Sequence, residues 1–94
     1  MSVHACTPKF RMGHLVATPG AMSALATDEI GQALARHLSG DWGNLDDHDW
    51  RMNDDALEHG GRILSAYFAP DGTKFWIITE CDRSATTILL PEEY

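Results

Sequence analysis

The residues with the clearest chemical potential in this chain are the acids between positions 47 and 58. With Asp47 as the first position of a twelve-residue calcium loop, carboxylates fall at positions 1, 3, 9 and 12. Position 5 is then Arg51, a cation, and position 6 is Met52, where the sharp turn of the loop requires glycine. Two requirements of a calcium loop fail, so we predict no metal site and no cofactor.

The histidines and cysteines lack the spacing of a metal or catalytic site. None of the five histidines has the HxxxH or HExxH pattern that brings two imidazoles to one zinc ion. The chain has neither a GxSxG turn nor a glycine-rich phosphate loop. His37 is expected to favour a helix dipole at a C-terminus, and Cys81 to be a half-buried thiol at a strand end. We therefore predict that the protein is not an enzyme.

Negative charge is concentrated in one segment. Seven of the fourteen carboxylates lie between Asp41 and Glu58, and Arg51 is the only basic residue among them. The segment has a formal charge of −6, and the whole chain one of −7. Charge this local can be sensed by another molecule and favours a basic protein partner. It opposes direct binding to nucleic acid or to an anionic membrane, because both require clustered Lys and Arg.

Three segments have helical patterns. Thr18 and Pro19 start the first, a short helix through position 25. Thr27 starts the second with two acids in its first turn, and its apolar residues recur at helical spacing until Gly40. The acidic segment is the third helix, capped by Asp46 and ended by the glycines at 60 and 61.

The remaining patterns predict strands. Apolar and polar residues alternate over 10–16, and positions 63–68, 74–80 and 85–90 are rich in aromatic and β-branched residues. Pro70–Thr73 contains Pro, Asp and Gly in the order of a hairpin turn. We expect a single domain over 1–94, with residues 1–8 as a loose lead-in. The predicted fold class is α+β: a three- to four-stranded antiparallel sheet with a C-terminal meander and two or three helices on one face.

A cytoplasmic location is expected. The longest apolar run is far shorter than the ~20 residues of a membrane helix. The first ten residues also lack the apolar stretch of a signal peptide. Cys6 and Cys81 have no CxxC spacing and no secretory context, so both are expected to be reduced.

Several stretches within residues 38–94 resemble a family of short bacterial proteins found on plasmids and other mobile elements. The likeness lies in SGDWG, GGRILSAY, DGTKFWIITE and DRSATTILLPEEY. Members are labelled plasmid-related proteins or type I restriction subunits M. The chain lacks the Asn/Asp-Pro-Pro-aromatic motif that a DNA methyltransferase needs. The resemblance therefore implies a mobile-element setting, and it transfers no functional residue.

The acidic segment is the predicted contact surface. Acids near its C-terminal end oppose the helix dipole, so they require another reason for their position. A tryptophan in the preceding turn is a candidate anchor for a partner. The predicted partner-binding residues are Asp41, Trp42, Asp46, Asp47, Asp49, Asp54, Asp55 and Glu58.

Two functions are compatible with these patterns. The first is an acidic binding protein from a mobile element, by analogy an anti-CRISPR or anti-restriction inhibitor. Its partner would be a basic host protein or nucleoprotein complex, contacted at a nucleic-acid-binding surface. The second is a small regulatory or accessory homodimer that associates through an exposed apolar face of the sheet, with the acids only solvating their helix.

Overall fold

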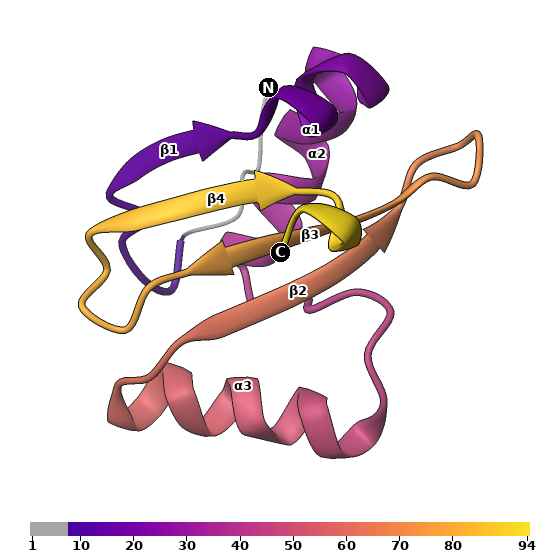
Figure 1. Ribbon diagram of the computed structural model, residues 1–94. Helices are drawn as coiled ribbons and strands as arrows, with labels where there is room; N and C mark the ends of the chain where they lie inside the picture. Colours follow the sequence, from indigo (N-terminus) through magenta and orange to yellow (C-terminus); the bar gives the residue numbers. More distant parts are fainter. Residues whose placement is uncertain (1–7) are drawn as a thin grey trace, which may run out of the picture.

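A computed structural model of the chain describes residues 8–94, so most of the predicted lead-in lies outside the described residues. The α+β fold class is confirmed (Figure 1). No helix among the described residues is long and apolar enough to cross a membrane. The elements are β1 (His14–Ala17), α1 (Pro19–Ala24), α2 (Thr27–Leu38), α3 (Asp47–His59), β2 (Ile63–Phe68), β3 (Lys74–Thr79), β4 (Ala85–Leu89) and the 3-10 helix η1 (Pro91–Glu93).

The sheet has the order β1-β4-β3-β2 and is mixed. β2, β3 and β4 form the predicted antiparallel meander, and Gly72 in the first hairpin turn has φ of +92°. β1 pairs with β4 in parallel, so the prediction of a purely antiparallel sheet was wrong. The reason is topological. The free edge of β4 takes up β1 in the direction that leads the chain into α1, which packs beside β4.

Two elements are shorter than predicted. β1 begins only at His14, because Gly13 has φ of +64° and breaks the extended run that starts at position 10. A Cβ on Gly13 would lie 2.3 Å from the Ser84 carbonyl oxygen. β3 ends at Thr79, so Cys81 lies in the following turn and is exposed rather than half-buried.

Local signals set the helix ends. Thr18 and Asp46 cap α1 and α3 with side-chain oxygens, as predicted. α2 is the exception, since its cap is Ala26 and not Thr27. The backbone N–H of Ala26 donates to the Glu29 carboxylate at 3.0 Å, so the acid in the first turn satisfies this N–H, and no side-chain oxygen caps the helix from Ala26.

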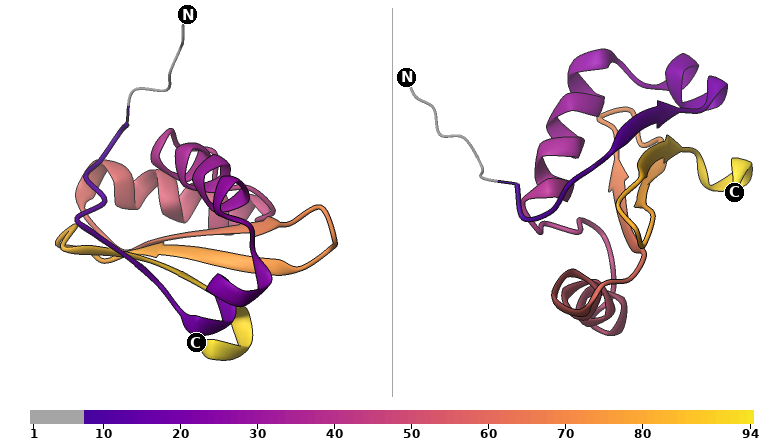
Figure 2. Two further views of the ribbon diagram at one scale, coloured as in Figure 1. Left: turned by 90° about the horizontal axis from the view of Figure 1, so that it is seen from above. Right: turned by 90° about the vertical axis from the view of Figure 1, so that its left-hand side faces the viewer.

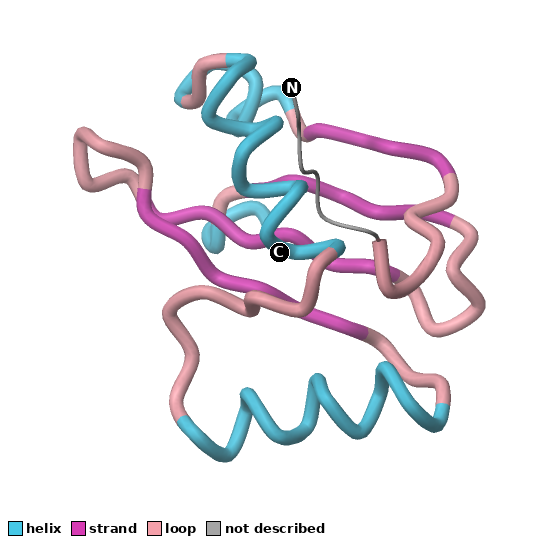
Figure 3. The backbone as a smooth tube through the Cα atoms, turned by 180° about the vertical axis from the view of Figure 1, so that it is seen from behind, coloured by secondary structure: helices cyan, strands magenta, loops and turns pink. Residues whose placement is uncertain are grey.

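The helices do not all pack on one face. α2 lies across one face of the sheet (Figure 3), and the core between them includes Ala33, Phe75 and Ile77. α3 lies along the β2 edge, below the sheet in Figure 1 and in the right-hand view of Figure 2. The prediction that all helices cover one face is therefore corrected for α3. The buried residue of α3 is the polar Asn53. Its side chain can bond the backbone groups at the edge of a sheet, which an apolar side chain cannot do.

The face of the sheet opposite α2 is partly covered by the C-terminus. The Tyr94 ring packs against Trp76, with ring centroids 5.7 Å apart, and Arg62 donates to the Tyr94 hydroxyl at 2.6 Å. Ile78 and Leu89 on this face are buried. The apolar surface predicted here is therefore smaller than the strand pattern indicated.

Candidate functional site

Asn53 fixes α3 against the outer edge of β2. Its amide N–H donates to the Leu64 carbonyl at 2.6 Å, and its amide oxygen accepts from the Leu64 N–H at 3.2 Å. The side chain thus supplies the donor and acceptor that a neighbouring strand would supply. This part of the β2 edge is closed to other strands.

The segment Trp42–Asn44 closes the next part of the same edge. The Ala66 N–H donates to the Trp42 carbonyl at 3.2 Å, and the Asn44 N–H donates to the Ala66 carbonyl at 2.7 Å. Gly43 forms a one-residue parallel bridge with Ala66 and has φ of +76°. A Cβ on Gly43 would lie 2.1 Å from the Ala66 carbonyl oxygen, so glycine is required for this approach.

Arg83 holds the C-terminal end of α3. Its guanidinium donates to the Ala56 carbonyl at 3.1 Å and to the Gly61 carbonyl at 2.5 Å. A positive charge next to the last carbonyls of a helix also favours the macrodipole. α3 is therefore attached to the sheet at its middle and at its end, which keeps its outer side in a fixed position.

α3 and its cap residue carry exposed carboxylates that lack lysine or arginine partners. Arg51 makes no ion pair with Asp47 or Asp55, although the spacing of four residues permits one. Within residues 8–94, ion pairs to acids of α3 come from His48 and His59. We use the name acidic face for the exposed acids of α3 and its cap that have no hydrogen bond to Trp42, which are Asp46, Asp47, Asp49, Asp55 and Glu58; Asp54 is exposed as well.

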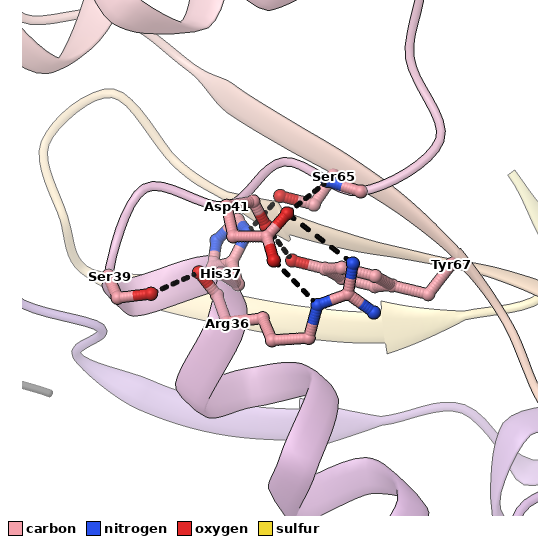
Figure 4. Close-up of polar contacts among 7 residues, drawn as sticks. Arg36, His37, Ser39, Asp41, Ser65 and Tyr67 are labelled. Carbon is pink, nitrogen blue, oxygen red and sulfur yellow. Dashed lines mark hydrogen bonds and ion pairs between the residues drawn. The ribbon is translucent and has the colours of Figure 1, made fainter. Parts of the chain in front are cut away.

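Three other predicted contact residues have structural partners. Trp42 is completely buried, so its predicted role as a contact anchor is wrong. Its indole N–H donates to the Asp54 carboxylate at 2.9 Å, which gives this exposed acid a part in holding α3. Asp41 pairs with Arg36 at 2.8 Å, and its carbonyl accepts from the Tyr67 hydroxyl at 2.6 Å (Figure 4). The hydrogen bond with Arg36 is the main reason why the pKa of Asp41 is lowered.

A groove of about 440 Å³ lies between α3 and β2. This volume is within the range of roughly 300–1,000 Å³ that is typical of small-molecule sites. Met52 in its lining is 58% exposed, so an apolar patch lies next to the acidic face. The groove is lined by apolar side chains of Leu45, Met52, Ala56 and Leu64, together with Asp49, Asp55 and Arg62.

His37 lies in a buried chain of hydrogen bonds that was not predicted. Its Nδ1 is 2.6 Å from the Ser65 hydroxyl oxygen, and its Nε2 is 2.8 Å from that of Thr79. The Thr79 and Thr86 hydroxyl oxygens are 2.8 Å apart, and Thr86 donates to the Met12 carbonyl at 2.7 Å. Because a carbonyl only accepts, the bonds between Nε2 and the Met12 carbonyl take one direction, and Nε2–H donates to Thr79. When the imidazole is neutral, Nδ1 then accepts from the Ser65 hydroxyl.

Burial keeps the imidazole of His37 neutral. Burial, and secondarily the charge of Arg83, lowers the pKa of His37 to about 4. The predicted role of His37 as a cation at the helix C-terminus was therefore wrong. Its proximity to Ser65 does not form a hydrolytic site either, because both side chains are inaccessible to a substrate. One signal in the sequence was available: hydroxyl residues occupy inward positions of three adjacent strands.

The segment that resembled a calcium loop is helical from Asp47 to His59. Its carboxylates therefore follow a helix surface and do not converge as they do in a twelve-residue loop. Ligand atoms of Asp46, His48 and Asp49 lie within 4.8 Å of one another at the start of α3. All three side chains are exposed to competing water.

We expect titration calorimetry with calcium, magnesium and zinc to show no binding tighter than roughly 1 mM, because few ligands converge and water competes for the metal. The same titrations on the Glu58→Gln and His48→Gln variants are the controls. A micromolar calcium isotherm that Glu58→Gln abolishes would contradict this expectation. A micromolar zinc isotherm that His48→Gln abolishes would do the same.

The β2 edge thus brings together the acidic face, an apolar groove and the contacts that hold α3. Five of the eight predicted contact residues form the acidic face, and the other three help to position the segment. The chain matches no protein-family model, no curated protein and no solved structure.

Proposed function

We propose that this protein is a non-enzymatic inhibitor whose acidic face binds a basic nucleic-acid-binding surface of a host protein or nucleoprotein complex. The main support is the exposure of five carboxylates on one attached helix, without lysine or arginine partners. From Asp47 to Glu58 the helix rises about 16 Å, which is the rise of about five base pairs. Carboxylates along such a length can replace backbone phosphates in a basic channel.

The attachment of α3 supports this proposal. A partner gains more from charges that are already fixed in place, because less side-chain and backbone freedom is lost on binding. Asn53 and Arg83 fix the helix backbone, and the neighbouring groove offers an apolar contact to the same partner. The resemblance to proteins of mobile elements favours a host defence complex, of the CRISPR or restriction type, as the target.

The alternative accessory dimer receives less support from the face opposite α2. Tyr94 packs over Trp76 there, and Ile78 is buried. A dimer through that face would first have to displace the C-terminal segment or pack around it.

The acidic face is tested by the triple substitution Asp47→Asn, Asp55→Asn and Glu58→Gln. These side chains do not take part in the hydrogen bonds that attach α3 to β2, so each change should alter stability by less than ~0.5 kcal/mol. The target is first captured from a host that has CRISPR and restriction systems, and binding is then measured by surface plasmon resonance at several salt concentrations. We expect at least ~10-fold weaker binding at low salt, mainly through the association rate, and a smaller difference at high salt.

A charge-matched control removes three exposed acids outside α3, with Asp28→Asn, Glu80→Gln and Glu92→Gln. This variant should bind like the wild type at each salt concentration. Equal weakening of both variants would mean that only net charge matters. Normal binding by the α3 variant at low salt would mean that the acids only solvate the helix.

A further inference from the structure

The two edges of the sheet differ in how they are covered. The β2 edge is closed by Asn53 and by the segment Trp42–Asn44. The β1 edge, at the opposite side of the sheet, faces the viewer in the left-hand view of Figure 2. Within residues 8–94, β1 has β4 as its only strand neighbour.

The outward backbone groups of β1 can be assigned from its bonds to β4. The N–H groups of His14 and Thr18 donate to carbonyls of β4 and of the turn before it. Because successive backbone groups of a strand alternate in direction, the N–H and C=O groups of Leu15 and Ala17 point away from β4. No hydrogen bond to these groups comes from another part of the described chain.

The side chains of β1 do not protect this edge. Leu15 and Val16 are each 46% exposed. The strand is only four residues long, but it contains no proline, lysine or bulge, three other features that prevent strands from adding to an edge. An open edge with exposed apolar side chains is suited to pairing with another strand.

We propose that β1 pairs with β1 of a second copy of this chain, antiparallel about a twofold axis at Val16. In this register Leu15 of one copy lies opposite Ala17 of the other, and both have outward backbone groups. The pairing forms four backbone hydrogen bonds, and the two Val16 side chains meet in a close non-hydrogen-bonded pair.

In this register the β1 edges of the two copies place complementary side chains opposite each other. His14 of one copy lies opposite Thr18 of the other. The Glu93 carboxylate is bound at that position, because it accepts from the Thr18 hydroxyl and from the Gly20 N–H at 3.1 Å. An imidazole N–H of His14 can therefore donate to Glu93 of the second copy, and the contact occurs twice. Asn53 and the segment Trp42–Asn44 already bond the outward groups of Leu64 and Ala66 in the middle of β2, which opposes further strand addition there, so the assembly is a dimer and not a filament.

The dimer goes beyond the proposed function and does not depend on it. It joins the two sheets into one of eight strands, with α2 of both copies on the same face. The two β2 strands are then separated by seven strand spacings, or about 34 Å. Each β2 carries its own α3 at the far edge, so the dimer presents two acidic faces to one large partner or to two small ones.

Sedimentation velocity over a range of protein concentrations tests this proposal. The wild type should form a species of twice the chain mass of 10.4 kDa. Val16→Lys places two ammonium groups against each other at the axis and should raise the dimer dissociation constant at least ~10-fold. The matched control is Phe68→Lys, an exposed apolar residue at the end of β2 and away from the proposed interface, which should leave the dimer unchanged.

Two further variants separate pairing from folding, with circular dichroism as the check that each one folds. Leu15→Pro removes an outward N–H without removing a bond to β4, and it should also give a monomer. His14→Glu should weaken the dimer by opposing Glu93 of the second copy. Hydrogen exchange of the Leu15 and Ala17 amides should slow with wild-type concentration but not in Val16→Lys. A wild type that stays monomeric at high concentration, or a dimer that Val16→Lys leaves intact, would overturn the proposal.

Discussion

Lowering the pH from 7 to 4 is expected to reduce the free energy of unfolding by about 3 kcal/mol through His37. Burial lowers the pKa of His37 from 6.5 to about 4. As the pH falls, the unfolded chain takes up a proton on this imidazole, whereas the folded protein keeps it neutral. The titration of His37 therefore has little effect on stability above pH 6.5, and stability is lost as the pH falls from 6.5 to 4. Denaturant unfolding at a series of pH values measures the slope.

The variant His37→Gln is the control. Its side-chain amide can form both hydrogen bonds in the same directions as the neutral imidazole, but it does not titrate. Its oxygen accepts from Ser65, and its N–H donates to Thr79. Its stability at pH 7 should be lower, because its shape fits less well, but its profile between pH 6.5 and 4 should be flatter. His48→Gln, at an exposed site, should keep the wild-type profile. A wild-type slope in His37→Gln would assign the effect to other groups.

Carboxylates with lowered pKa values affect the free energy of unfolding at a lower pH than His37 does. Asp41 is kept ionised mainly by its hydrogen bond with Arg36, and the stability from this pair is lost as the pH falls below 3.8. The side chain of Asp41 is 45% exposed, so water screens the pair and the loss should be small. The two pH ranges are therefore separable in one experiment.

The elements of this fold were predictable because their signals act over a few residues. The Asp46 cap, the glycine after α3 and the turn at Gly72 each fix backbone angles locally. The position of α3 was not predictable in this way. It depends on Asn53 and Arg83, whose side chains reach backbone carbonyls 11 and 27 residues away. The parallel pairing of β1 with β4 is also nonlocal, so periodicity within either strand does not show its direction.

The candidate site was predicted only in part, for a related reason. Exposure of the α3 acids follows from their charge, because ionised side chains are rarely buried without a partner. Trp42 was misassigned because a tryptophan in a turn can face either solvent or core. The hydrogen bond from its indole N–H to Asp54 satisfies the polar end of the side chain, so the ring can be buried in the core. The network of His37 gives only a weak signal in the sequence, because Ser and Thr are ordinary residues in strands.

Replacing Gly43 with alanine is expected to lower the free energy of unfolding by more than about 3 kcal/mol. The positive φ costs about 1–2 kcal/mol for any L-residue with a Cβ. The larger cost is steric, because the Cβ would lie 2.1 Å from the Ala66 carbonyl oxygen. Relief of this clash breaks the two backbone bonds to Ala66 and pulls Trp42 out of its buried site. Thermal unfolding followed by tryptophan fluorescence and circular dichroism measures the loss.

The variant Gly60→Ala separates the two causes of the loss in Gly43→Ala, which are the steric clash of the Cβ and the positive φ. Gly60 has φ of +82°, close to that of Gly43, but a Cβ there would meet no atom within 4 Å. The difference between the two losses therefore measures what the contact of the Trp42–Asn44 segment with β2 contributes. A release of this segment also frees the backbone groups of Ala66, so Gly43→Ala should form species larger than a dimer. Equal losses in the two variants, with no larger species, would show that this segment does not protect the β2 edge.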